Sequence, residues 1–257
     1  TGPALAGWTI AAGGIAASYA AQAALIAASL VMLGALRTPA RAPSTTRFDL
    51  RAIREGLRFV VQNRVVLGCM TLDLLAVIFG GAAALLPIYA RDILQVGERG
   101  YGLLASSLDL GALVMSLVLV LLPPVERAGR ALVTAVAAYG VATIAFGLSR
   151  WFPLSVLAYM AVGMADQVSV VMRGTIIQLA TPDAIRGRVS GVNMIFIGAS
   201  NQLGAAESGF VAALTTPTFS VVSGGVASIA IVAVVAAALP ALRRYRIGRR
   251  AVTTPVR

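Results

Sequence analysis

Long apolar runs dominate the chain, and short segments between them hold most of its charges. The runs cover 1–36, 66–90, 100–125, 131–149, 151–182 and 189–242. Five ionisable residues interrupt them: Asp73, Asp109, Asp166, Arg173 and Glu207. A helix that crosses a hydrocarbon core of about 30 Å needs about 20 apolar residues. The pattern therefore predicts membrane helices at 2–16, 18–36, 66–89, 102–123, 130–149, 152–178, 189–214 and 219–242.

Two of these boundaries depend on turn residues. The run 1–36 would measure about 54 Å as one helix, which is too long for one crossing, and Gly13-Gly14 is its natural break. Thr215-Thr216-Pro217-Thr218 separates the last two helices. The first helix is short and begins without a methionine. We therefore expect the chain to be a fragment whose N-terminal part is absent.

The 37–65 segment is the longest polar stretch between predicted helices. Its second part places Leu50, Ile53, Leu57 and Val60 at helical spacing, with Arg51, Arg54 and Arg58 on another face. This pattern is typical of an amphipathic helix that lies on a membrane surface. We expect the segment to be a cytoplasmic loop that separates two bundles, with two helices before it and six after it.

Composition supports an all-α membrane protein. Of the 257 residues, 58% are hydrophobic and 12% are charged, whereas an average soluble domain has about 25% charged residues. The chain has no His and no Lys, so the usual proton shuttle, the commonest metal ligand and a Schiff-base amine are all missing. Its one cysteine, Cys69, cannot form an internal disulfide or a zinc cluster. We therefore expect no metal, no cofactor and no enzymatic activity.

The net charge of +11 is explained by topology. Threading the helices alternately places 17 of the 21 arginines on one side, in the segments 37–65, 126–130, 179–188 and 243–257. The opposite side holds Arg91, Arg99 and Arg150. The positive-inside rule then predicts a cytoplasmic C-terminus, with the basic loops facing the lipid surface rather than a nucleic acid.

Ionisable groups inside membrane helices are costly and mark candidate functional positions. Asp166 and Arg173 lie seven residues apart on one helix face. They indicate a substrate or proton site in a cavity, or a structural pair that ties this helix to a neighbour. Asp73 is a second proton-site candidate, because a carboxyl group in low dielectric can exchange a proton near neutral pH; a structural role is the alternative.

Polar residues also recur along the 189–214 helix. Asn193, Ser200 and Glu207 are spaced by seven, and Asn201 widens the polar zone at the middle of the helix. Such a stripe beside small residues suits a cavity-lining helix or hydrogen bonding between helices.

Two short charged loops are candidates for a conformational role. One contains Glu126, Arg127 and Arg130, and the other contains Arg186 and Arg188. They could bridge to carboxylates at neighbouring helix ends, or they could serve as ordinary positive-inside anchors.

Six sequence segments together resemble the major facilitator superfamily, in the branch of the bacterial enterobactin exporter and related drug-efflux proteins. They are TLDLLAV (71–77), LLPIYARDIL (85–94), QLATPD (178–183), RGRVS (186–190), FIGASNQLG (196–204) and ESG (207–209). The resemblance implies about eight of an expected twelve transmembrane helices. The implied units are 1–36 from the N-terminal bundle, the inter-bundle loop 37–65, the C-terminal bundle 66–242 and the tail 243–257.

The resemblance also implies a function. A member of this branch would be a secondary active transporter of the bacterial inner membrane that exports a small organic molecule, such as a siderophore or a drug, by alternating access driven by protons. The partners would be the substrate, protons, the bilayer and the missing N-terminal half. A non-transporting receptor or scaffold on the same fold is the alternative.

Overall fold

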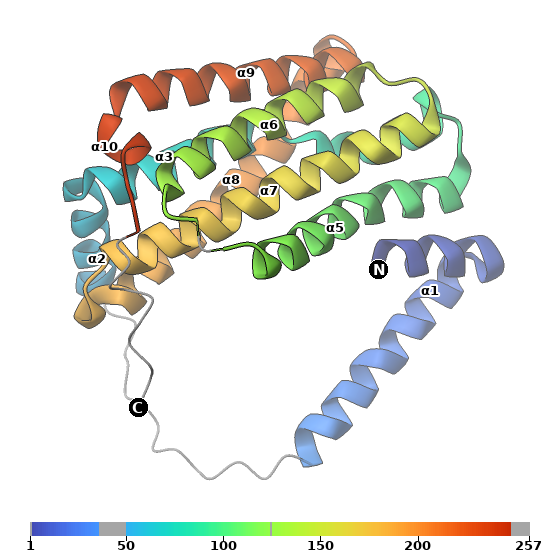
Figure 1. Cartoon of the computed structure of the whole chain (residues 1–257). Helices are drawn as coiled ribbons and strands as arrows, with labels where there is room; N and C mark the ends of the chain where they lie inside the picture. Colours follow the sequence, from blue (N-terminus) through green and yellow to red (C-terminus); the bar gives the residue numbers. More distant parts are fainter. Residues whose placement is uncertain (1, 36–49, 124, 248–257) are drawn as a thin grey trace.

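The computed structural model describes residues 2–35, 50–123 and 125–247, which form helices and short connections with no strand in these ranges (Figure 1). The longer helices are α1 (Gly2–Ala35), α2 (Leu50–Gln62), α3 (Arg64–Phe79), α5 (Gly97–Leu121), α6 (Ala128–Leu148), α7 (Phe152–Ala180), α8 (Arg186–Leu214) and α9 (Pro217–Ala238). The short ones are η1 (Ala82–Leu85), α4 (Leu86–Ile88), the π-helical turn η2 (Tyr89–Ile93), η3 (Asp183–Ile185) and α10 (Pro240–Arg243).

Six segments in the described ranges are long and apolar enough to cross a membrane. They are Gly13–Gly34, Arg64–Ile93, Gly97–Leu121, Ala128–Leu148, Phe152–Ala180 and Pro217–Ala238. The all-helical membrane architecture is therefore confirmed. The count of about eight stays a prediction, because the segment before Gly13 and the polar α8 are not among the six.

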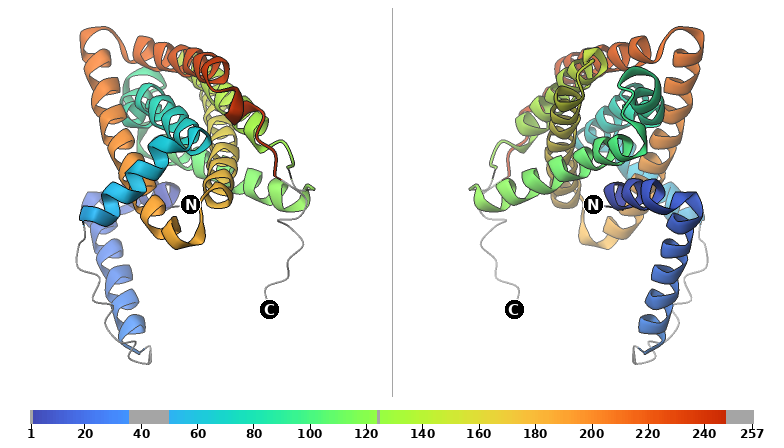
Figure 2. Two further views of the ribbon diagram at one scale, coloured as in Figure 1. Left: turned by 90° about the vertical axis from the view of Figure 1, so that its left-hand side faces the viewer. Right: turned by 90° about the vertical axis from the view of Figure 1, so that its right-hand side faces the viewer.

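Helix α1 bends where the sequence predicts a break. Gly14 has φ 74° and ψ 178°, a backbone conformation that residues with a Cβ rarely adopt. The part of α1 before Gly14 lies against α5, and the part after it extends away from the bundle with exposed side chains (Figures 1 and 2).

The bundle from α3 to α9 is held together by close helix contacts at glycines. Helix α5 packs on α7, α7 packs on α6, and α6 packs on α9. A Cβ at Gly163 of α7 would lie 2.0 Å from the Leu108 carbonyl oxygen, and one at Gly111 of α5 would lie 2.0 Å from that of Met160. Gly140 and Gly225 make the equivalent contact between α6 and α9. Small residues thus let these backbones approach closely.

Two predicted helices are interrupted. The helix expected at 66–89 ends at Phe79 and resumes as η1, α4 and η2. Gly80 and Gly81 favour the break because glycine is a poor helix former, and Pro87 lacks the N–H that an unbroken helix would need. The helix expected at 219–242 ends at Ala238, and Pro240 starts α10. Prolines and paired glycines within apolar runs, which the hydrophobic pattern ignores, explain both corrections.

Helix α2 lies where the sequence predicts an amphipathic helix. Val60 is fully buried and Ile53 is half-buried, while Arg54 and Arg58 are exposed. Leu57 departs from the expectation, since it is 43% exposed. Gly56 packs against the start of α8, where an added Cβ would lie 2.9 Å from the Arg188 carbonyl oxygen. The loop before residue 50 lies outside the described residues.

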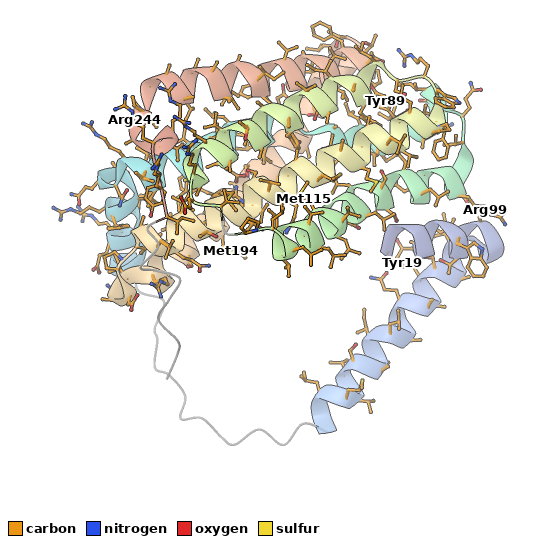
Figure 3. All side chains as sticks on the ribbon, in the orientation of Figure 1. Tyr19, Tyr89, Arg99, Met115, Met194 and Arg244 are labelled. Carbon is orange, nitrogen blue, oxygen red and sulfur yellow. The ribbon has the colours of Figure 1, made fainter. Side chains whose placement is uncertain are left out.

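The described parts of the arginine-rich segments gather at one end of the bundle. Helix α2 contacts α8, and α10 contacts α3 and α6. The Gly129 amide donates to the Tyr245 carbonyl at 3.3 Å, and the Ile247 amide donates to that of Glu126 at 2.9 Å. In Figure 3, Arg244 lies at this end, and Arg99 lies at the opposite end with Tyr89. This arrangement agrees with the alternate threading of the helices.

Candidate functional site

The interruption after α3 leaves backbone carbonyls inside the bundle that side chains of other helices hydrogen-bond. The Tyr139 hydroxyl of α6 donates to the Gly80 carbonyl at 2.7 Å. The Ser228 hydroxyl of α9 donates to the Ala76 carbonyl at 3.3 Å, and the Gly80 amide donates to the same carbonyl at 2.8 Å. Broken helices within a membrane need such partners, because an unsatisfied carbonyl costs several kcal/mol there.

Glycines of α8 and α9 pack directly on this interruption. An added Cβ at Gly224 would lie 2.0 Å from the Phe79 carbonyl oxygen, and one at Gly204 would lie 2.6 Å from that of Val77. A Cβ at Gly81 would lie 2.7 Å from the Ser208 hydroxyl oxygen. The backbone of the interruption therefore lies directly against Gly204 of α8 and Gly224 of α9, and a side chain at either glycine would collide with it.

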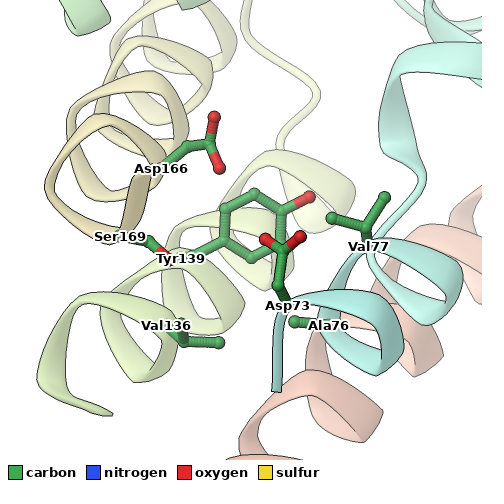
Figure 4. A pocket seen from close by; sticks show the side chains of 7 residues that line it. All are labelled: Asp73, Ala76, Val77, Val136, Tyr139, Asp166 and Ser169. Carbon is green, nitrogen blue, oxygen red and sulfur yellow. The ribbon is translucent and has the colours of Figure 1, made fainter. Parts of the chain in front are cut away.

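A cavity of about 220 Å³, partly open to the outside, lies beside the interruption. Residues of α3, η1, α5, α6, α7 and α8 line it. Its side chains with polar groups are Asp73, Tyr139, Tyr159, Asp166, Arg173, Ser200 and Asn201. A second space of about 10 Å³ adjoins it and is lined in part by Asp73, Tyr139, Asp166 and Ser169 (Figure 4).

Arg173 and Asp73 form an ion pair that links α7 to α3. Their side chains are 7% and 14% exposed, so the pair is largely shielded from water. Breaking such a pair leaves an uncompensated buried charge and costs about 3–5 kcal/mol. The structure thus places Arg173 both in the cavity wall and in a contact between helices, which joins the two roles that the sequence leaves open.

Asp166 has a different environment from Asp73. Within the described residues, no hydrogen bond or ion pair reaches its carboxylate, although Arg173 lies on the same helix. The carboxylate points toward the Tyr139 ring, which the Asp73 carboxylate overlaps in this view (Figure 4). Both residues line the cavity, but Arg173 reaches across to Asp73 of α3, and Asp166 has no cationic partner among the described residues.

The polar stripe of α8 contributes only its middle part to the cavity. Ser200 is buried and donates to the Ile197 carbonyl at 2.9 Å, and Asn201 is exposed on the cavity wall. Asn193 and Glu207 do not line the cavity. Each of these two residues is seven positions from Ser200, which is about 10 Å along the helix. A cavity of this size does not extend that far. Glu207 instead accepts a 3.3 Å hydrogen bond from Ser208.

The charged loops make local contacts at the arginine-rich end. Arg188 pairs with Glu55 of α2 at 2.5 Å, and Arg186 pairs with Asp183 within its own turn. The Glu126 carbonyl accepts from Ile247, and the Arg127 and Arg130 side chains are exposed. Of these residues, Arg188 is the one that the structure shows bridging to a carboxylate of another helix.

Sequence reasoning missed Tyr139 and Tyr159, because an aromatic residue inside an apolar helix does not stand out from its neighbours. Tyr159 packs on Phe146 with ring centroids 4.9 Å apart. A signal for the helix interruption was present, since Gly80-Gly81 repeats the Gly-Gly signature that marks the bend in α1. No group of three or more acidic or cysteine ligands gathers among the described residues to hold a metal.

Comparison with known proteins identifies the family. A family model described as transmembrane secretion effector, MFS_3, matches residues 1–251. The chain belongs to this family. The transmembrane secretion effector family is the major facilitator branch that the six sequence segments indicate, and membership agrees with the expectation of a non-enzymatic membrane protein.

Several curated relatives of this chain share one name. The chain is 28% identical over 244 residues to proteins named enterobactin exporter EntS from Escherichia coli O1:K1, Escherichia coli O157:H7 and Shigella boydii serotype 18. Each match covers 95% of this chain and 58% of the relative, so the chain spans a little more than half the length of these relatives. No solved structure matches.

Proposed function

We propose that this chain forms the C-terminal part of a secondary active exporter and that the cavity beside Gly80-Gly81 belongs to its substrate pathway. The observation that carries the proposal is the coincidence of a discontinuous helix with a polar cavity inside an otherwise apolar bundle. Discontinuous helices at binding sites are typical of secondary transporters. Membership in the transmembrane secretion effector family and the exporter name of the relatives support the direction of transport.

The proposed organisation follows the sequence expectation. Residues 1–36 belong to an N-terminal bundle, 37–65 to the loop between bundles, 66–242 to a C-terminal bundle of six helices, and 243–257 to a cytoplasmic tail. In this arrangement α8 crosses the membrane together with the six apolar segments. Its position against α3 and α9 supports this. The substrate would be a small organic molecule, as the name of the relatives suggests.

Proton coupling is assigned to Asp166 rather than to Asp73. Asp73 is paired with Arg173, and protonating it would break an ion pair that links two helices. Asp166 has no such contact in the described residues, and it faces a cavity that water can enter. Uptake of a proton would neutralise a carboxylate that is otherwise uncompensated in low dielectric.

The test is efflux from bacterial cells that lack their own exporters and express the protein from its complete reading frame. We expect accumulation of a fluorescent efflux substrate to fall relative to cells with an empty vector, and to rise again with Asp166→Asn. The matched control is Asp109→Asn, because Asp109 is an acid within α5 whose side chain is exposed and does not line the cavity. Equal accumulation in cells with the protein and cells with the vector, across a panel of dyes, would contradict export.

A further inference from the structure

The charges around the cavity leave one carboxylate without compensation. Among the described residues that line the cavity, Arg173 is the single base, and it is paired with Asp73. Asp166 on the same wall has no basic partner. With both carboxylates ionised, the site therefore holds one net negative charge inside an apolar bundle. Such a charge is unfavourable unless a cation or a proton accompanies it.

The walls near Asp166 are aromatic. Tyr139 of α6 and Tyr159 of α7 both line the same cavity as Asp166. Tyr139 is held by its hydrogen bond to Gly80, and Tyr159 is held by its packing on Phe146. In Figure 4 the Asp166 carboxylate is directed toward the Tyr139 ring. Aromatic rings attract cations at their faces, and the attraction is stronger where water is excluded.

We propose that this cavity binds an organic cation, a protonated amine or an onium group with apolar substituents, through the Asp166 carboxylate and the rings of Tyr139 and Tyr159. This inference rests on the proposed function, because it names the substrate class of the same cavity. An organic anion is disfavoured there, since Asp166 would repel it and the guanidinium of Arg173 is already engaged by Asp73. The apolar residues Val77, Leu108 and Val162 of the lining suit the substituents.

The experiment compares two probes of nearly the same shape and opposite charge. Tetraphenylphosphonium and tetraphenylborate are each measured by equilibrium dialysis against the protein expressed from its complete reading frame and purified in detergent, with detergent alone as the background. We expect the cation to bind at least tenfold more tightly than the anion. Equal binding of the two ions, or tighter binding of the anion, would overturn the proposal without any variant.

Variants then locate the binding. Asp166→Asn is expected to weaken tetraphenylphosphonium binding at least tenfold, whereas Asp166→Glu keeps the charge and retains most of the affinity. Asp109→Asn, which removes an equal charge from α5 outside the cavity, is expected to leave binding unchanged. Thermal unfolding of each variant checks that it is folded. Loss of cation binding in Asp109→Asn but not in Asp166→Asn would place the site elsewhere and refute the proposal.

The two proposals fail separately. Efflux that depends on Asp166, combined with no preference for the phosphonium over the borate, would retain the exporter and reject the cationic substrate. Cation binding that depends on Asp166, combined with no efflux of any dye in the panel, would retain the binding site and reject export.

Discussion

The Tyr139 hydroxyl donates a 2.7 Å hydrogen bond to the Gly80 carbonyl, and this bond connects α6 to the helix interruption that follows α3. The same residue lines the small space that Asp73 and Asp166 also line. One side chain thus connects the stability of the interruption with the shape of the site.

Replacing this tyrosine tests the connection. Tyr139→Phe keeps the ring and leaves the Gly80 carbonyl without its side-chain donor, which is expected to cost about 1–3 kcal/mol of unfolding free energy. The measurement is thermal unfolding of the purified protein in detergent. Tyr19→Phe is the control, because Tyr19 is 69% exposed and its change is expected to leave the transition temperature unaltered. Equal transition temperatures for Tyr139→Phe and the unmodified protein would show that this hydrogen bond does not support the interruption.

Close packing of α5 on α7 predicts opposite outcomes for two glycines of the same helix. Gly163→Ala places a methyl group 2.0 Å from the Leu108 carbonyl oxygen, so the helices must separate, at an expected cost of about 1–3 kcal/mol. Gly174→Ala meets nothing within 4 Å and is expected to be neutral or slightly stabilising. The measurement for each variant is the midpoint temperature at which the folded, monodisperse protein is lost on graded heating. A pair of variants with the same midpoint would argue against the tight contact.

The ion pair of Asp73 and Arg173 is best tested by a double-mutant cycle. Asp73→Asn or Arg173→Gln alone strands a largely buried charge and is expected to destabilise the protein by about 3–5 kcal/mol. The double variant removes both charges and is expected to recover a substantial part of that loss. Unfolding in a graded denaturing detergent gives the four free energies. Additive single losses would mean that the two side chains do not interact.

The ion pair at the arginine-rich end should be much weaker. Arg188 and Glu55 are 42% and 54% exposed, so Arg188→Ala is expected to cost less than about 1 kcal/mol. Gly56→Leu should be more damaging, because its side chain would meet the backbone of Arg188 at 2.9 Å and Val192 at 3.2 Å. Thermal unfolding ranks the two changes. A larger loss in Arg188→Ala would mean that charge, rather than close packing, holds α2 against α8.

The helical elements could be predicted from the sequence because membrane helices need long apolar runs, and the chain has little else. The bend at Gly14 and the amphipathic α2 were also predictable, since each depends on a local pattern. The interruption at Gly80 was not found, because hydropathy stays high through Ala82–Leu86 and conceals a change of backbone geometry. The hydrophobic pattern measures how apolar the side chains are. The side chains of a broken membrane helix can be as apolar as those of an unbroken one.

The charged residues of the candidate site were predictable, and its tyrosines and its pairings were not. Asp73, Asp166 and Arg173 stand out as charges in apolar helices, and the structure brings them to one cavity with Ser200 and Asn201. The partner of Arg173 depends on how α3 and α7 cross. The helical periodicity of one segment carries no information on how that segment is placed relative to another helix. The exclusion of Asn193 and Glu207 has the same origin, because periodicity gives the face of α8 and not the level at which the cavity ends.

The glycine contacts around Gly80 and Gly81 have a consequence for how such a site can diversify. Both glycines line the cavity, and a side chain added at Gly80 would meet Tyr139 at 2.6 Å, while one at Gly81 would meet Ser208 at 2.7 Å. These two positions therefore have no room for a larger side chain. Selection for a new ligand would instead act on other lining positions, such as Tyr159, Asp166, Val170 and Asn201, which are not part of the glycine contacts of the interruption.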